Sequence, residues 1–302
     1  MSNQQTQLSS ASGFNTNNII FSKPLVGNIP NSTPLITFKR ILFSVTNDDG
    51  TVGDLIIKTQ RLFSYGVTQN TDAKTQEVIG YSIPVILHDR DGPTREQADF
   101  TDVFNAIVEK TKDHILTPSV KREIDPRGKI EERRDLKDLN PLYIKKVDGV
   151  PVPGNSPTLY TKLIHNKKTN KITSMFFDIE GNSLNPLDLI GKYCFITAAI
   201  KFESIFIGAN GKISFQVKLY EAEIELQQTG TRRLLTTSRP VIAGNTVLTS
   251  VPNNPMQNNT NSDSEGSVSE SDDSDTQQLT IQPTSVEQSK VVRKVVRKVN
   301  KK

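Results

Sequence analysis

Two pairs of tyrosine and lysine have the residue types and spacing for binding chemistry. Tyr143 with Lys145, and Tyr160 with Lys162, lie two positions apart in segments with strand character. Alternate residues of a strand point to the same side, so each pair presents a ring beside an ammonium group. Rings stack on unpaired bases while lysines follow phosphates, a combination suited to single-stranded nucleic acid of any sequence. The alternative is that each tyrosine caps a core edge beside a lysine that solvates the sheet. Three further lysines lie close to the second pair: Lys167, Lys168 and Lys171.

Catalytic motifs are weak in this sequence. Residues 88–92 (HDRDG) gather acid, base and cation, but they are better explained as a strand end and a turn, with Asp91 near a helix N-terminus. Cys194 stands in an apolar strand without a nucleophile motif and is expected to be a core thiol. Neither phosphate-binding glycine motif, GxxxxGK[ST] or GxGxxG after a strand, is present. We therefore expect no catalytic residues, no cofactor and no enzyme.

A nucleic-acid-processing enzyme is the alternative that needs a metal. It would require clustered carboxylates for Mg²⁺, and the local candidates are Asp48, Asp49, Asp89 and Asp91. With three histidines far apart and one cysteine, a zinc site is not expected.

Composition limits the class of protein. The 302 residues are 34% hydrophobic and 23% charged, which fits one sizeable core with polar extensions. The longest apolar runs, such as 194–200, fall far short of the roughly 20 residues of a membrane helix, and we expect a soluble, unsecreted protein. A net charge of +4 is weak support for an anionic partner.

Strand patterns dominate the chain before residue 90 and after residue 140. The expected strands are 35–45, 54–60, 62–67, 79–88, 142–147, 158–165 and 171–178. Residues 191–226 add a long hairpin turning at Asn210-Gly211, with a β-bulge where the alternation slips at Tyr220-Glu221. A long bulged hairpin is typical of a small closed barrel.

One amphipathic helix interrupts the β pattern. Thr94 and Gln97 are spaced as a capping box, and Pro118 closes the segment. Its apolar stripe contains Phe100, Val103, Phe104, Ile107, Val108 and Ile115. Residues 119–140 are so highly charged that they predict an exposed, mobile excursion. Phe104, Phe206 and Phe215 are assigned to packing rather than stacking. The fold class is therefore mainly β with added helices (α+β), an OB-like antiparallel barrel with one main helix and disordered tails.

The predicted domain plan has three parts. Residues 1–17 form a disordered tail, 18–235 the OB-like domain with a helical and charged insertion at 93–140, and 236–302 a second disordered tail. The second tail contains an acidic Ser-rich block at 262–275 and a basic arm at 290–302. The basic side chains assigned to nucleic-acid contact in the arm are Arg293, Lys294, Arg297 and Lys298. A solvated, weakly helical tail and an acidic membrane surface are the alternatives.

Several segments resemble those of a viral family. They are KPLVGN near the start, LIIKTQRLFSYGV, DRDGPTREQADFTDVFNAIVEK, LNPLYIKK, PTLYTKLI and GKYCFITAAIKFESIFIGANGKISFQVKLYEAEI. Across roughly residues 18–235, the chain is similar to mostly uncharacterised proteins of nucleocytoplasmic large DNA viruses. That group is similar in turn to the single-stranded-DNA-binding proteins of poxviruses and African swine fever virus.

The resemblance implies an OB-type barrel that coats single-stranded DNA during viral replication or recombination, without catalysis. The implied partners are single-stranded DNA, with RNA left open, further copies along the strand, and replication proteins, with no membrane. The implied location is the viral replication factory in the host cytoplasm, with packaging in the virion left open. The alternative from another class is a virion structural or interaction protein that uses the same β domain for protein contacts.

Overall fold

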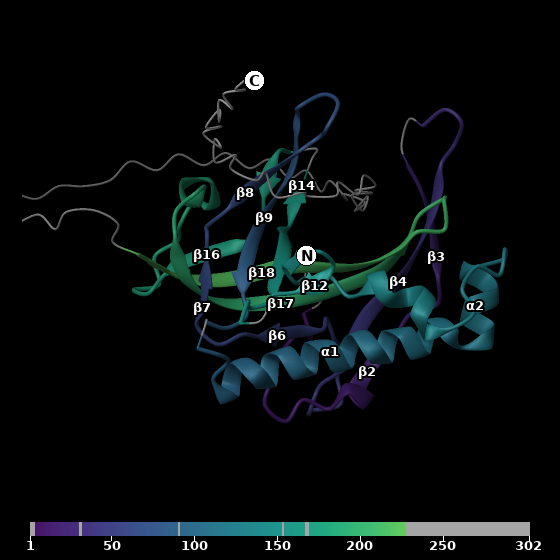
Figure 1. Cartoon of the computed structure of the whole chain (residues 1–302), viewed down its shortest axis with the longest axis horizontal. Coiled ribbons are helices and arrows are strands. Elements are labelled where there is room, and N and C mark those ends of the chain that lie inside the picture. The colour runs from purple at the N-terminus through teal and green to yellow at the C-terminus, as the bar shows by residue number, and fades with distance from the viewer. Residues whose placement is uncertain (1–3, 30–31, 90, 153, 167–168, 228–302) are drawn as a thin grey trace, which may run out of the picture.

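The computed structural model describes residues 4–29, 32–89, 91–152, 154–166 and 169–227, and they form a mainly β structure (Figure 1). Its longest strands are β17 (Cys194–Ile207) and β18 (Ile213–Leu226), which pair along their whole length as an antiparallel hairpin. The predicted long hairpin is therefore confirmed, and the other elements of the barrel are arranged around it.

Five strands close into a barrel. β7 (Leu62–Ser64), β9 (Val78–Ile86) and β13 (Thr158–Leu163) lie in that order between β17 and β18, and the direct β17–β18 pairing closes the ring. β13 pairs with β18 in parallel, and the other four pairings are antiparallel. The closed five-stranded barrel is consistent with the predicted OB-like architecture.

Bulges bend the long hairpin at two places. Ala199 pairs with Glu221 and Ile200 with Leu219, so Tyr220 is the extra residue, where the sequence predicted a bulge. The turn differs from the expected two-residue form. It is a loop from Gly208 to Lys212. Gly211 adopts a positive φ of +81°, whereas Asn210 does not.

The remaining strands extend this sheet or form small hairpins. The extensions are β1 (Leu8–Ser10), β2 (Ile19–Phe21), β3 (Leu25–Asn28), β4 (Thr37–Thr46), β5 (Val52–Gly53), β6 (Ile56–Lys58), β8 (Thr68–Thr71), β10 (Leu142–Tyr143) and β16 (Met175–Asp178). The hairpins are β11 (Lys146–Val147) with β12 (Val150–Pro151), and β14 (His165–Asn166) with β15 (Lys171–Ile172).

The N-terminal segment departs from the prediction of disorder for residues 1–17. β1 pairs in parallel with β6, and the 3₁₀ helix η1 (Thr16–Asn18) follows it. The backbone carbonyl of Gln5 accepts a 2.8 Å hydrogen bond from the Asn47 side chain, and Ala11 is buried. The open edge of β6 supplies backbone hydrogen bonds that do not depend on apolar side chains, so composition alone did not reveal this strand.

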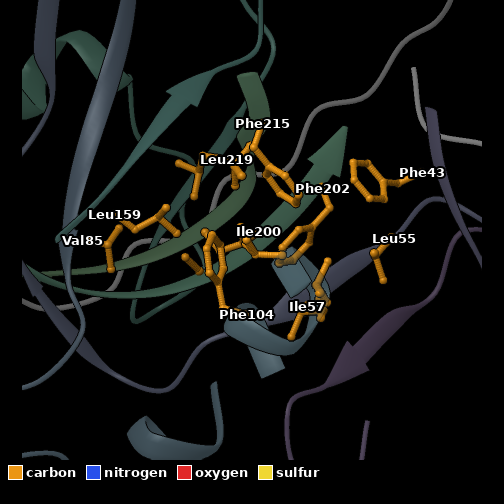
Figure 2. Close-up of a cluster of buried hydrophobic side chains, with 14 of the residues drawn as sticks. Phe43, Leu55, Ile57, Val85, Phe104, Leu159, Ile200, Phe202, Phe215 and Leu219 are labelled. Atoms are coloured by element: carbon orange, nitrogen blue, oxygen red, sulfur yellow. The ribbon is translucent and has the colours of Figure 1, made fainter. Parts of the chain in front are cut away.

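The main helix, α1 (Arg95–Leu116), lies along one side of the barrel (Figure 1). The predicted Thr94/Gln97 capping box is confirmed, with both of its hydrogen bonds formed. Figure 2 shows Phe104 of α1 in the buried cluster with Phe202 and Phe215, whose ring centroids lie 5.4 and 6.3 Å away. The apolar stripe of α1 therefore seals the barrel core.

The charged segment after Pro118 is better anchored than its composition suggested. It contains α2 (Pro118–Ile124), which begins at Pro118, and the 3₁₀ helix η2 (Arg133–Leu139). The buried apolar side chains of this segment are Ile124, Ile130, Leu136 and Leu139. A further 3₁₀ helix, η3 (Pro186–Leu189), lies outside the segment and precedes β17. The expectation of an exposed excursion is therefore wrong for these four positions, because isolated apolar residues reach a core that only the fold supplies. The expectation that the domain has one main helix is likewise not confirmed, since α2 follows α1.

Candidate nucleic-acid interface

One cross-strand row on the outer face of the barrel brings distant aromatic residues together. Successive pairings link Phe195 to Phe63, Phe63 to Ile86, Ile86 to Thr158, and Thr158 to Tyr143. Residues directly opposite one another in paired strands lie on the same face of the sheet. The row therefore crosses β17, β7, β9, β13 and β10, about 19 Å at the usual strand spacing.

Three more tyrosines widen this row. Tyr160 lies two residues along β13 from Thr158 and hence on the same side. Tyr65 and Tyr193 lie just outside the ends of β7 and β17, and their ring contacts with Phe63 place them beside the row. The aromatic strip is defined here as Phe63, Tyr65, Tyr143, Tyr160, Tyr193 and Phe195. It contains four of the six tyrosines in the chain.

Ring contacts hold the strip together while leaving it open to solvent. The Phe63 centroid lies 5.2 Å from Tyr65 and 6.0 Å from both Tyr193 and Phe195, all in edge-to-face arrangements. Tyr143 and Tyr160 form a second such pair at 6.1 Å. The exposed fractions are 49% for Tyr65, 49% for Tyr193 and 40% for Tyr143. Large exposed aromatic area of this kind is typical of an interaction surface.

The two ring groups lie within electrostatic range of each other. Loss of water raises the pKa of Tyr160, and the neighbouring phenols of Tyr143 and Tyr65 raise it further. The strand register places Tyr65 and Tyr160 on either side of β9: Tyr160 pairs with Pro84, and Ser64, the residue before Tyr65, pairs with Val85.

Gly66 positions the Tyr193 side of the strip. At Gly66, φ is +84°, and an added Cβ would lie 2.4 Å from the backbone oxygens of both Leu189 and Lys192. The neighbouring Val67 N–H donates a 3.0 Å hydrogen bond to Leu189 O. The loop before β17 can therefore pack directly on the end of β7, which brings the Tyr193 ring to 5.7 Å from Tyr65.

The structure brings together only some of the residues predicted from sequence. Tyr160 and Lys162 lie half-buried on the outer side of β13, and Lys162 Nζ is 3.4 Å from Gln216 Oε1. Tyr143 joins Tyr160, but β10 ends at Tyr143, so the strand geometry expected to align Lys145 with it does not apply. Lys145 is exposed and follows the strand, and Lys171 is exposed in the separate β14–β15 hairpin.

The other predicted contacts lie outside the described residues. They are Lys167 and Lys168 and, in the basic arm, Arg293, Lys294, Arg297 and Lys298. Sequence reasoning missed Phe63, Tyr65, Tyr193 and Phe195, although each pair shows the two-residue spacing used to select Tyr160 and Lys162.

Charge is uneven around the strip. The Arg61 guanidinium lies 3.4 Å from the centroid of the Phe195 ring and binds Glu225, with Nε 2.8 Å from Oε2. Glu225 pairs with Phe195, and Glu221 and Glu223 continue the exposed carboxylate row along β18. The β18 side of the strip is therefore acidic, apart from Arg61.

The catalytic alternatives gain no support from the described residues. Asp89 and Gly92 form an isolated β-bridge at the predicted turn, and burial raises the pKa of the Cys194 thiol to about 11, which leaves it protonated at neutral pH. Among the described residues, no group of three or more His, Cys, Asp or Glu could hold a metal ion. Within the same residues no helix is both long and apolar enough to cross a bilayer.

Two viral proteins are similar to part of this chain. The chain is 25% identical to the Early 31 kDa protein of Frog virus 3 (isolate Goorha) over 170 residues, 55% of this chain and 62% of that protein. It is 24% identical to the Uncharacterized protein 007R of Invertebrate iridescent virus 3 over 175 residues, 56% of this chain and 36% of that protein. The chain thus spans less than two thirds of either relative.

A solved structure overlaps weakly with this one. It is gp2.5, a single-stranded DNA binding protein encoded by bacteriophage T7, at 14% identity and a TM-score of 0.35, covering 60% of this chain and 91% of that protein. Residues 12–278 match the family described as "Protein of unknown function (DUF2738)", and the chain belongs to that family.

Proposed function

We propose that this protein binds single-stranded DNA with little sequence preference and is not an enzyme. The observation that carries the proposal is the aromatic strip, in which three tyrosines are 40–49% exposed along one side of the barrel. Unpaired bases offer ring faces to such side chains, whereas bases stacked inside a duplex do not. Stacking requires no particular base, which accounts for the low sequence preference.

Charge suggests the direction of the bound strand. Phosphates would be repelled along the Glu221, Glu223 and Glu225 row on β18, and Arg61 relieves this repulsion only at Phe195. Two lysines lie towards the opposite end of the strip: Lys162 on β13, and Lys145 beyond it, after β10. The strand is therefore expected to run from Phe195 across β7 and β13 towards Lys145.

The setting is part of the same proposal. The relatives are proteins of large DNA viruses, which supports a role in viral DNA replication or recombination, with further copies and replication proteins as partners. The proposal also includes similarity to the single-stranded-DNA-binding proteins of poxviruses and African swine fever virus. It further includes location at cytoplasmic replication factories and contact of the basic arm with DNA.

Binding of the full chain to fluorescent oligo-dT tests the proposal, with a duplex of equal length for comparison. We expect oligo-dT to bind more tightly than duplex, with an affinity that falls steeply as salt rises. Equal affinity for the two, or no binding at low salt, would refute the proposal. A metal-dependent nuclease assay on the same samples tests the absence of catalysis.

The interaction-protein alternative rests on the same exposed strip, because apolar rings also suit protein contacts. Copy number in purified virions, compared with abundance at the replication site, separates the two functions. A virion component without oligo-dT affinity would favour the alternative.

A further inference from the structure

A second surface lies beside the aromatic strip, on the β16–β18 side of the barrel (Figure 1). It is a cavity of about 580 Å³, and the apolar residues Leu184, Ile224 and Leu226 contribute to its lining, here called the apolar floor. Phe195 also lines it, so the cavity borders the strip. Ile179 is 61% exposed and Leu226 46%, which is apolar surface that a partner could cover.

The rim of this cavity is acidic. It carries Asp178, Glu180 and Glu225, and the carboxylates of Glu221 and Glu223 continue along β18. Hydrogen bonds from Asn182 lower the pKa of Asp178, and the bond from Arg61 lowers that of Glu225. We call this cavity and its rim the acidic groove. Its chemistry fits a segment with apolar residues on one side and cations on the other.

The chain itself contains such a segment, the basic arm KVVRKVVRKVNKK at 290–302. It has seven lysines and arginines and five valines, and at helical spacing the valines fall within an arc of about 140°. Its valines match the apolar floor, and its cations match the carboxylate rim. The match in both properties distinguishes the arm from an arbitrary basic peptide.

Chain connectivity brings the arm within reach. The described part of the chain ends at Gln227, which itself lines the acidic groove. A flexible chain of 62 residues, the length of 228–289, has a root-mean-square span of roughly 40–50 Å. Tethering of this kind gives an effective concentration near the millimolar range, so even a weak site would be occupied.

We propose that the basic arm, residues 290–302, docks in the acidic groove of its own chain. The docked arm lies next to Phe195 and thus at the acidic end of the aromatic strip. Phosphates of a bound polyanion compete with the groove for the same cations, so the arm leaves the groove when it contacts nucleic acid. Docking itself does not depend on nucleic-acid binding and is measured without it.

The test uses the full chain with a fluorophore attached at Asn300→Cys. Cys194 is buried and its thiol stays protonated at neutral pH, so the label attaches to the new cysteine. We expect the anisotropy of the label to be high and to fall as salt rises. Glu180→Lys with Glu223→Lys should abolish the excess anisotropy, as should Val295→Asp with Val296→Asp in the arm.

Glu77→Lys with Glu131→Lys is the control, because it changes the charge equally at exposed positions that belong neither to the cavity lining nor to the carboxylate row of β18. This pair should leave the anisotropy unchanged. Equal loss in control and groove variants, or no loss in either, would overturn the proposal; the acidic block at 262–275 would then be the candidate holder of the arm. A signal that rises with protein concentration would also overturn it, because it would indicate docking onto a second copy.

Hydrogen exchange of the same chains guards against a folding artefact. Backbone amides at Glu180 and Asn182, and those at the end of β18, should lose protection in the Val295→Asp, Val296→Asp chain, which leaves the groove sequence intact. Unchanged protection there would count against docking even if the anisotropy fell.

Discussion

Replacement of Tyr65 by alanine removes a ring from the middle of the aromatic strip. Tyr65 contacts both Phe63 and Tyr193, and the register places it across β9 from Tyr160 of the second ring group. A base stacked on one aromatic side chain contributes about 1–3 kcal/mol. The affinity for oligo-dT should therefore fall by about 5- to 150-fold.

The same substitution should leave the protein folded. It removes two edge-to-face contacts, at 5.2 and 5.7 Å, each worth about 0.5–1.5 kcal/mol. The loss of about 1–3 kcal/mol is smaller than the 5–15 kcal/mol typical of a folded domain. The side chain is 49% exposed, so little core packing is lost with it.

Fluorescence anisotropy with labelled oligo-dT measures the affinity, and urea unfolding measures the stability of the same variants. Tyr81→Ala is the matched control. Tyr81 is a half-buried tyrosine whose ring lies 5.5 Å from His165, on the same side of β9 as buried Ile83 rather than on the outer side. It should cost comparable stability without loss of affinity. If Tyr65→Ala binds oligo-dT as the unmodified chain does, or if Tyr81→Ala weakens binding equally, the assignment of the strip as the binding surface is wrong.

Three further predictions concern the surroundings of the strip. Arg61→Ala should weaken oligo-dT binding and reduce the slope of log K against log salt by about 0.7, because the cation above Phe195 is lost and Glu225 is left unpaired; an unchanged slope would contradict a phosphate contact there. Gly66→Ala should lower the urea midpoint more than Gly50→Ala. Both glycines have φ above +80°, which costs alanine about 1–2 kcal/mol at either position, but of the two only Gly66 would bring the new Cβ against backbone, at 2.4 Å. Equal losses of stability would show that the packed loop moves aside freely. Burial raises the Cys194 pKa from 9.0 to about 11, so the stability that depends on a neutral thiol is complete below pH 9 and is lost as the pH rises from 9 towards 11. Over this range the free energy of unfolding in urea should decline more steeply than in Cys194→Ala, and parallel curves would refute the prediction.

Local patterns were sufficient for the elements whose periodicity is strong. The capping box at Thr94 and the apolar stripe of α1 were read correctly because both depend on contacts within three or four residues. The bulge at Tyr220 was visible because a slipped alternation is itself a local signal. The buried side chains of residues 119–140 were missed, because single apolar residues among charges show no periodicity.

The site was predicted only in part for the same reason. Tyr160 and Lys162 share one strand, so their common side followed from spacing. Tyr65, which lies across β9 from Tyr160, is 95 positions away in the chain, and no local pattern relates the two. The sequence placed Lys145 in the same strand as Tyr143, but β10 ends at Tyr143, four residues before the predicted end at 147.

The sequence by itself determined a mainly β domain with one long bulged hairpin, one capped amphipathic helix and polar, charge-segregated extensions beyond it. The sequence also predicted a closed barrel, but only the tertiary structure decided which strands pair in the ring and in which register, which joins Tyr143, Phe63 and Phe195 in one cross-strand row. The physical reason is that alternation fixes which side of a strand a residue faces, whereas register between distant strands depends on how the whole core packs.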